Sequence, residues 1–341
     1  MEVKFGLQLP HDPVDLILKA AIFADKNGFN SVFSPDHLIG VGIKNWDAFE
    51  AFTLLAAISQ HTKNVTLGTC VSDVLRKNPA VVAQSAVTLD WLSKKDVILG
   101  LGAGEGMNLV PYGISTKLVV SKLEEGANIV RKFLDGGVVN FKGKFFRMKD
   151  AMIPRANKKV KLWIAGNQRR TMLITAKYAD GWIPTASMGS ERYKEGLKFI
   201  KELSKREIEP ALFAYIVVDE DEDRARKTIE LPAKLISLLS PLRKTFLEKV
   251  GIDEKDLPFP NLLEFTFNEE NVKKVLEFAN KVPFDLIEDR FIFGNPSQVV
   301  ERLNEFVKAG VRHFILTPLV QHHKYLDVVR LIAERVIPQF R

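Results

Sequence analysis

The chain has 341 residues, of which 46% are hydrophobic, and carries 49 basic and 42 acidic residues for a formal net charge of +7. This length suits one large α/β domain or two smaller ones, and because no run of about 18 apolar residues occurs, no membrane span is expected. The basic residues are scattered among acidic ones and Cys70 is the only cysteine, so no nucleic-acid partner is expected and an internal disulfide or thiolate zinc cluster is excluded. The opening segment, MEVKFGLQLP, shows no signal-peptide pattern, and we expect a cytoplasmic enzyme.

Short apolar segments alternate with amphipathic ones along the chain. Apolar runs predict eight strands, at residues 3–9, 31–34, 65–71, 97–101, 160–165, 181–185, 211–218 and 312–317. Helical spacing, with Pro or Gly at the boundaries, predicts helices at residues 13–27, 47–60, 80–92, 118–134, 169–178, 190–206, 297–309 and 325–336. This alternation predicts an α/β fold of the (β/α)8 TIM-barrel type, formed as a single domain over residues 1–341.

Two segments depart from this alternation. Residues 138–153 alternate around Lys142-Gly143 and predict a β-hairpin on the surface. Residues 231–287 show no strand rhythm and contain five prolines, which predicts a helical insertion late in the barrel.

An open doubly wound sheet is the competing fold. Its dinucleotide motif, GxGxxG, would directly follow the first strand. Here the first strand ends in Leu9-Pro10, and the closely spaced glycines follow the fourth strand, where Glu105 occupies the slot of the final glycine. Both observations argue against a Rossmann site.

Polar residues follow four of the predicted strands. Because the carboxyl ends of barrel strands meet at one mouth, these residues are expected to converge there: Asp36 and His37, Cys70 to Asp73, Gly104 with Glu105 and Asn108, and Ala165-Gly166-Asn167. His37 is the strongest acid–base candidate, since imidazole titrates near neutrality. The spacing alone leaves two alternatives open, a histidine that caps a loop and, for Glu105, an exposed loop carboxylate.

The remaining motifs carry less information. Backbone N–H groups of Ala165-Gly166-Asn167 precede a helix and could bind a phosphate, although glycine at such a turn is common for steric reasons. Cys70 reads as a small buried hydrophobic residue. His322 and His323 are adjacent and so do not share a helical face, and His11 and His61 have no nearby ligand partners in sequence. HExxH, GxSxG and P-loop motifs are absent from the sequence, so no metal site, hydrolase or kinase is predicted.

Five segments carry a family resemblance that covers nearly the whole chain: GLQLP, GFNSVFSPDH, LGTCVSDVLRKNPAVVAQSAVTLDWLSKKDVILGLGAGE, WIAGNQRRTMLITAKYADGWIPT and FIFGNPSQVVERLNEFVKAGVRHFIL. The chain resembles the luciferase-like flavin and deazaflavin oxidoreductases. Within them it most resembles the branch that uses coenzyme F(420), which includes methylenetetrahydromethanopterin reductase, a secondary-alcohol dehydrogenase and a glucose-6-phosphate dehydrogenase. The resemblance implies a TIM barrel with a late helical insertion.

The resemblance also implies roles for individual residues. His37 matches a catalytic histidine, and Glu105 matches a carboxylate beside the reacting centre that is proposed as a proton donor. Cys70-Val71 matches a non-prolyl cis peptide that forms a bulge behind the deazaflavin ring. The implied cofactor-binding positions are Asp36 at the ring, Gly104 and Asn108 in the loop of Glu105, and Ala165, Gly166 and Asn167 as a backbone cradle for the phosphate.

Two departures from the family pattern concern the substrate side. Gln8 stands where the reductase has a glutamate, and Val41 stands where the alcohol and sugar enzymes have a tryptophan, with Trp46 nearby but out of register. The loop 38–46 and the insertion are expected to shape the substrate pocket. Pro35-Asp36-His37 replaces the Glu-His-His that is more frequent in flavin monooxygenases, which favours the deazaflavin.

Three hypotheses follow from the residues and the resemblance together. The first is reversible hydride transfer between coenzyme F(420) and a small organic substrate. The second keeps the fold but uses FMN in a luciferase-like monooxygenase. The third is a non-catalytic flavin- or deazaflavin-binding protein. Because relatives of this type are often dimers, a homodimer is the expected assembly.

Overall fold

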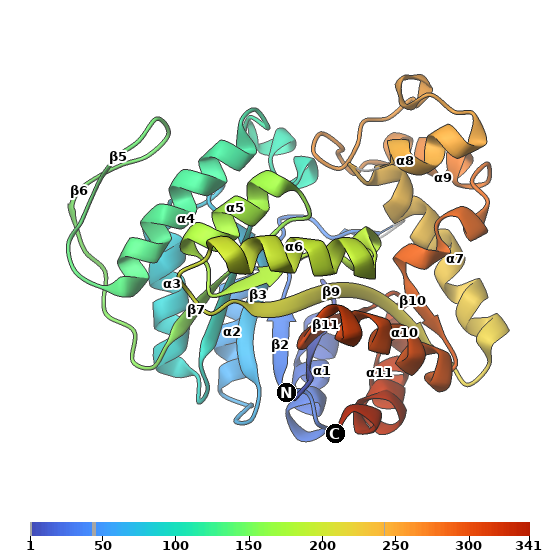
Figure 1. The fold of residues 1–341 in the computed structure, drawn as a ribbon, viewed down its shortest axis with the longest axis horizontal. Helices are drawn as coiled ribbons and strands as arrows, with labels where there is room; N and C mark the ends of the chain where they lie inside the picture. Colours follow the sequence, from blue (N-terminus) through green and yellow to red (C-terminus); the bar gives the residue numbers. More distant parts are fainter. Residues whose placement is uncertain (1, 43–45, 242) are drawn as a thin grey trace.

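Parallel strands close into a barrel at the centre of the molecule (Figure 1). The computed structural model describes residues 2–42, 46–241 and 243–341. Within them, eight strands pair in a closed ring: β1 (Lys4–Gln8), β2 (Ser31–Ser34), β3 (Thr66–Asp73), β4 (Val97–Gly102), β7 (Val160–Ala165), β8 (Gly181–Ile183), β9 (Glu209–Val218) and β11 (His313–Pro318). Each strand is parallel to its neighbour, and β11 pairs with β1 to complete the ring. The predicted TIM barrel is therefore confirmed.

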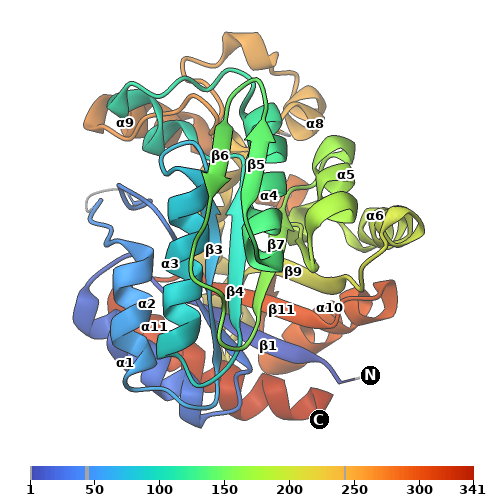
Figure 2. The ribbon, with the colours of Figure 1, turned by 90° about the vertical axis from the view of Figure 1, so that its left-hand side faces the viewer.

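Helices wrap the outside of the barrel (Figure 2). They are α1 (Val14–Lys26), α2 (Ala51–Ser59), α3 (Pro79–Leu92), α4 (Val119–Asp135), α5 (Arg169–Tyr178), α6 (Ser190–Leu203), α10 (Pro296–Ala309) and α11 (His322–Leu331). Local sequence fixes several starts: the Asn78 side chain accepts from Ala80 N ahead of Pro79, and Asn295 forms a capping box with Gln298. The second helix begins at Ala51 rather than at residue 47, because the Glu50 side chain caps Thr53 N.

Side chains fill the barrel interior between the strands. The interior cluster consists of Phe33, Cys70, Ile98, Trp163, Ile183, Ala211 and Ile315. A larger apolar layer lies between the strands and the surrounding helices. As in other barrels of this type, this packing leaves loops at the carboxyl ends of the strands to carry function.

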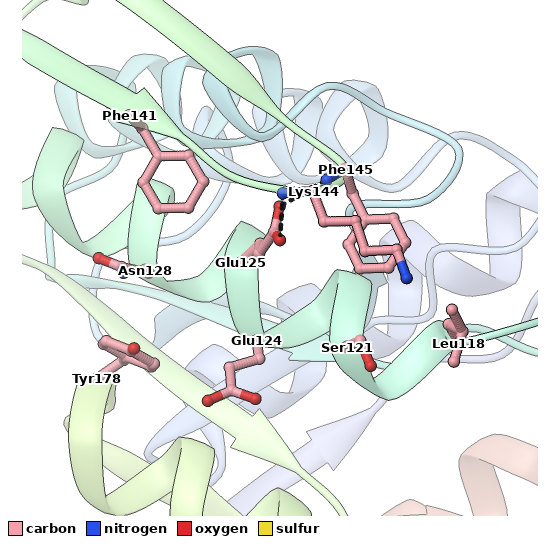
Figure 3. Close-up of a pocket in the computed structure, with 9 residues that line it drawn as sticks. All are labelled: Leu118, Ser121, Glu124, Glu125, Asn128, Phe141, Lys144, Phe145 and Tyr178. Carbon is pink, nitrogen blue, oxygen red and sulfur yellow. Dashed lines mark hydrogen bonds between the residues drawn. The ribbon is translucent and has the colours of Figure 1, made fainter.

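The predicted surface hairpin is present as β5 (Val139–Lys142) and β6 (Arg147–Ala151), paired antiparallel. It projects from the barrel beside α4 (Figure 1). The Glu125 carboxylate of α4 accepts hydrogen bonds from the backbone N–H groups of Lys144, Phe145 and Phe146, at 2.8, 2.9 and 3.1 Å (Figure 3). One helical carboxylate thus fixes the turn of the hairpin.

The late helical insertion is also present and has its own hydrophobic core. It includes α7 (Glu222–Leu239), α8 (Lys244–Leu247) and α9 (Glu269–Ala279), followed by the short strand β10 (Ile292–Gly294), which pairs with the end of β9. α7 begins at Glu222 and runs past residue 231, where the insertion was expected to begin. The prolines suggested a break, but α7 continues through Pro232, because Ile229 and Ala233 on either side remain packed in the second core.

In the described part of the chain, no helix combines the length with the apolar character needed to cross a bilayer.

Candidate active site

The carboxyl ends of β2 and β4 bring two of the predicted site residues, His37 and Glu105, close together. His37 Nε2 lies 3.6 Å from Glu105 Oε2. Asn108 Oδ1 accepts a hydrogen bond of 2.8 Å from Leu38 N, which joins the loop after β2 to the loop after β4. Residues that are far apart in sequence therefore form one polar cluster at the barrel mouth.

A bulge in β3 forms the floor of this cluster. The Cys70–Val71 peptide bond is cis, as the family resemblance implied, and the register between β3 and β4 shifts between Thr69 and Ser72. Gln8, the last residue of β1, donates a hydrogen bond from Nε2 to Cys70 O at 2.9 Å. Burial raises the pKa of the Cys70 thiol, so this side chain is a neutral packing group and the backbone is the notable feature.

Two glycines of β4 make room for that bulge. A Cβ on Gly100 would lie 2.2 Å from Thr69 O. A Cβ on Gly102 would lie 2.6 Å from Val71 Cγ2 and 3.9 Å from Ala165 Cβ. Gly100 and Gly102 of LGLGAGE therefore allow close packing against β3, a role different from that of a dinucleotide-binding loop.

Asp36 is buried beneath His37 and is held by several groups of the protein. Its carboxylate accepts hydrogen bonds from the Ser72 hydroxyl and from Lys77 Nζ, the latter at 3.0 and 3.1 Å. Arg76 Nη2 lies 3.5 Å from Asp36 Oδ2, and Arg76 Nε pairs with Asp73 Oδ2 at 2.5 Å. These contacts anchor the loop of His37, and direct contact between Asp36 and a cofactor ring stays a prediction.

Burial shifts the pKa values of His37 and Glu105 in opposite directions. Burial, aided by the Arg76 charge, lowers the pKa of His37 to about 4, although Asp36 and Asp73 act in the other direction. Burial raises the pKa of Glu105 to about 7, and Arg76 reduces that increase. Near neutral pH the imidazole is therefore an unprotonated base beside a carboxyl group that exchanges a proton readily.

The loop that carries Glu105 is fixed at both ends. Gly104 adopts φ +78°, and the turn Gly106–Asn108 follows Glu105 directly. Gly106 N donates to Leu262 O of the insertion at 2.9 Å, and a Cβ on Gly106 would lie 2.7 Å from the Glu264 backbone. The insertion therefore packs directly on the loop of Glu105.

Three residues near the predicted site were not among the predicted ones. His11, which has no ligand partner nearby in the sequence, places Nε2 3.2 Å from His37 Nδ1, because the two loops that carry the histidines are neighbours only in the folded barrel. Tyr215 on β9 interacts electrostatically with both Glu105 and Cys70, and burial raises the pKa of its phenol. Thr317, which pairs with Tyr215 across β11 and β9, has a buried hydroxyl with no partner among the described residues. Tyr215 and Thr317 could have been found only from a prediction of which strands pair and in what register.

The predicted phosphate cradle lies at the end of β7. Gly166 has φ +150° and its N–H donates to Ile183 O at 3.2 Å, while the Asn167 side chain bonds Thr185. The following helix, α5, has no side-chain cap and no acid in its first turn, which contains Arg169 and Arg170. A helix start of this kind suits an anion, although the Gly166 N–H is already used within the protein.

Of the loop that was expected to shape the substrate pocket, residues 43–45 lie outside the described residues. In the remainder, Val41 is half exposed and Trp46 Nε1 donates to Gly42 O at 2.8 Å. Trp46 is thus held by its own loop, and its relation to a substrate stays a prediction.

A separate hollow of about 390 Å³ lies on the outside of the barrel (Figure 3). It is bounded by α4, the hairpin and Tyr178 at the end of α5, and the residues drawn there include none of the predicted site residues. In the described part of the chain, no group of three or more His, Cys, Asp or Glu side chains is arranged to hold a metal ion.

Comparisons with known proteins show a family and relatives for this chain. Residues 4–313 match the profile of the luciferase-like monooxygenase family. A phthiodiolone/phenolphthiodiolone dimycocerosates ketoreductase of Mycobacterium tuberculosis is 27% identical over 79% of this chain and 74% of its own length. A coenzyme F(420)-dependent glucose-6-phosphate dehydrogenase of Amycolatopsis mediterranei is 28% identical over 96% of this chain and 95% of its own.

A solved structure shares the fold over its full length. It is the coenzyme F(420)-dependent tetrahydromethanopterin reductase of Methanopyrus kandleri, with a TM-score of 0.80, 22% identity and 100% of both chains covered.

Proposed function

The chain belongs to the luciferase-like monooxygenase family, and from that premise we propose that it is a coenzyme F(420)-dependent oxidoreductase that transfers a hydride between the deazaflavin and a small organic substrate. The observation that carries the proposal is the pair of His37 and Glu105, 3.6 Å apart at the barrel mouth. Relatives that use coenzyme F(420) match nearly the whole chain, which supports this cofactor.

The residues at the mouth fit a flat ring with polar edges. The cis Cys70–Val71 bulge forms a backbone surface, and Gly100 and Gly102 hold it close to β4. Gln8 Oε1 and Thr317 Oγ1 are buried acceptors without partners among the described residues, so a bound molecule with N–H or O–H groups would satisfy them. At the end of β7, the uncapped start of α5 suits the anionic tail of the cofactor.

The cofactor supplies the carbon that accepts or releases hydride, and the protein supplies position and proton transfer. If the substrate is an alcohol, His37 takes its hydroxyl proton at a ring nitrogen, since a pKa of about 4 leaves the imidazole unprotonated near neutral pH. Glu105, with a pKa of about 7, supplies or takes up the second proton. If a methylene-pterin is reduced instead, Glu105 acts as a polar stabiliser or proton relay.

Gln8 limits which residues can exchange a proton with the substrate. A neutral amide replaces the glutamate of the reductase, and its orientation is fixed by the hydrogen bond to Cys70 O. The amide cannot exchange a proton near neutral pH, so proton transfer falls to His37 and Glu105. The identity of the substrate stays open between alcohols, carbonyl compounds and pterins.

Cofactor choice is tested first by measuring the binding of coenzyme F(420) and of FMN to the purified protein. Tight binding of the deazaflavin with weak binding of FMN is expected, and the reverse order would contradict the proposal. Turnover is then measured with His37→Ala and Glu105→Gln. A positioned acid or base contributes about 10²–10⁴ in rate, so each variant should lose about that factor while cofactor affinity changes much less.

His61→Ala provides the matched control for these variants. His61 is exposed at the end of α2, away from the strand ends that form the mouth, so its replacement should leave turnover unchanged. Normal turnover in both site variants would refute the assignment of His37 and Glu105.

The second candidate is an FMN-dependent monooxygenase, which the name of the family favours. In that case reduced FMN in the same cleft would activate oxygen. Oxygen consumption by the protein with reduced FMN and an organic substrate separates the two candidates, since the deazaflavin enzyme should consume none above background.

A further inference from the structure

His11 contacts the imidazole that the proposed reaction uses as a base. Its Nε2 lies 3.2 Å from His37 Nδ1, and the two ring centroids are 4.8 Å apart. The opposite nitrogen of His37, Nε2, is directed toward Glu105 at 3.6 Å. His37 therefore has one nitrogen in contact with His11 and the other facing Glu105.

Only one proton can lie between two neutral imidazoles, so one ring donates and the other accepts. If His37 donates from Nδ1, its Nε2 carries a lone pair toward the cleft and can act as a base. If His11 donates instead, His37 carries its proton on Nε2 and has no lone pair on that side. The direction of a single hydrogen bond therefore decides whether His37 can take a proton from a substrate.

The surroundings favour donation from His37. A hydrogen bond to the backbone of Ile39 favours a proton on the His37 ring. His37 Nδ1 is the ring nitrogen that faces His11 Nε2, at 3.2 Å. A proton on Nδ1 therefore provides the donor for that contact, while Nε2 faces Glu105.

Charged groups face the two rings from several elements. Asp12 adjoins His11, and its Oδ1 lies 3.2 Å from Nε2 of His322 on α11. Burial is the largest cause that lowers the pKa of His11, to about 3, and electrostatic interactions with His37 and His322 act in the same direction. Asp36, Asp73 and Arg76 face His37 from β2 and β3. Both imidazoles are therefore neutral near pH 7, which is the condition for a hydrogen bond between one donor and one acceptor.

We propose that His11 is a positioning residue, which accepts a hydrogen bond from His37 Nδ1 and thereby directs the Nε2 lone pair of His37 toward the side of Glu105 at the barrel mouth. The proposal rests on the proposed function for its catalytic meaning, since it assigns to His37 the part of the base. The tautomer itself is a property of the protein without any cofactor. It can therefore be measured separately.

The first test is a long-range ¹H–¹⁵N NMR spectrum of the protein labelled in its six histidines, without cofactor, near pH 7. Single variants of each histidine assign the signals. The expected result is His37 protonated at Nδ1 and His11 unprotonated at Nε2. A His37 ring protonated at Nε2 in the wild-type protein would overturn the proposal, whatever the variants do.

Two variants then separate positioning from simple packing. His11→Phe keeps a planar ring but removes the acceptor, whereas His11→Gln keeps an acceptor oxygen. The Phe variant should lose the Nδ1–H preference of His37, and kcat should fall about 5–100-fold with little change in cofactor affinity. The Gln variant should retain the tautomer and recover most of the rate, and equal losses in both variants would contradict positioning.

The outcomes distinguish this inference from the proposed function. If the tautomer of His37 is as expected in the wild-type protein and in both His11 variants, but no deazaflavin-dependent turnover is found, the proposed function fails and the positioning role of His11 holds. If turnover requires His37 but neither the tautomer nor kcat changes in His11→Phe, the proposed function stands and the role of His11 is refuted. Unfolding midpoints in urea confirm that each variant is folded.

Discussion

Replacement of Glu105 by Gln tests the electrostatics of the barrel mouth without any ligand. In the folded protein, burial raises the pKa of this carboxyl from its ordinary value of 4.5 to about 7. The folded chain thus retains a proton that the unfolded chain has released. Its stabilising contribution is full below pH ~4.5 and is lost as the pH rises through about 7.

The size of this contribution follows from the two pKa values. At about 1.36 kcal/mol per pKa unit, the upper limit is about 3.4 kcal/mol. The Glu105 side chain is 34% exposed, so screening by water reduces the expected difference to about 1–2 kcal/mol. Glutamine has the shape of the protonated acid but no titration, and it should not show this dependence on pH.

Urea unfolding of the wild-type protein and Glu105→Gln at about pH 5 and about pH 8.5 measures the difference. We expect similar stabilities at the lower pH and a variant that is about 1–2 kcal/mol more stable at the higher pH. Glu195→Gln, at an exposed position on α6, is the control and should show no such change. An equal effect of Glu105→Gln at both pH values would refute the inferred pKa.

Two further variants test the packing and the ion pairs around the site. Gly106→Ala should lower the free energy of unfolding by about 1–3 kcal/mol, because the new Cβ would lie 2.7 Å from the Glu264 backbone; an unchanged urea midpoint would show that the insertion yields freely. Lys77→Met removes the ammonium that binds both oxygens of buried Asp36 and should cost about 1–3 kcal/mol, somewhat below the loss for a fully buried pair. Lys274→Met, whose partner Glu270 is exposed, should leave the midpoint unchanged in the same assay, and equal effects of the two lysine variants would contradict the importance of burial.

Much of the fold was predictable because barrel strands are buried on both faces and read as short apolar runs. The strand 31–34 and the helix 169–178 were predicted with the bounds that the structure has. β10 was missed because three residues carry no periodic pattern. α7 runs through Pro232, because the packed face of the helix tolerates the proline. Tertiary packing outweighed the local signal at that position.

The site was predictable where residues directly follow a strand. His37 and Glu105 could be paired because parallel strands end at one mouth, and Cys70–Val71 could be named only through the family resemblance. His11 lies in a longer loop, and Thr317 and Tyr215 depend on which strands are neighbours and in what register. That information arises from closure of the barrel. The alternation of residues along any one strand does not contain it.

The connection between Gly106 and the insertion is made by main-chain atoms: Gly106 N donates to Leu262 O, and the Glu264 backbone packs on the glycine. Because no side chain of the insertion takes part in that hydrogen bond, the side chains of Leu262 and Glu264 can change over evolutionary time without breaking it. If the insertion shapes the substrate pocket, as predicted, natural selection can alter that pocket while Glu105 stays in place. A library randomised at the exposed side chains around Leu262, with Gly106 retained, would be a suitable starting point for directed evolution of new substrate ranges.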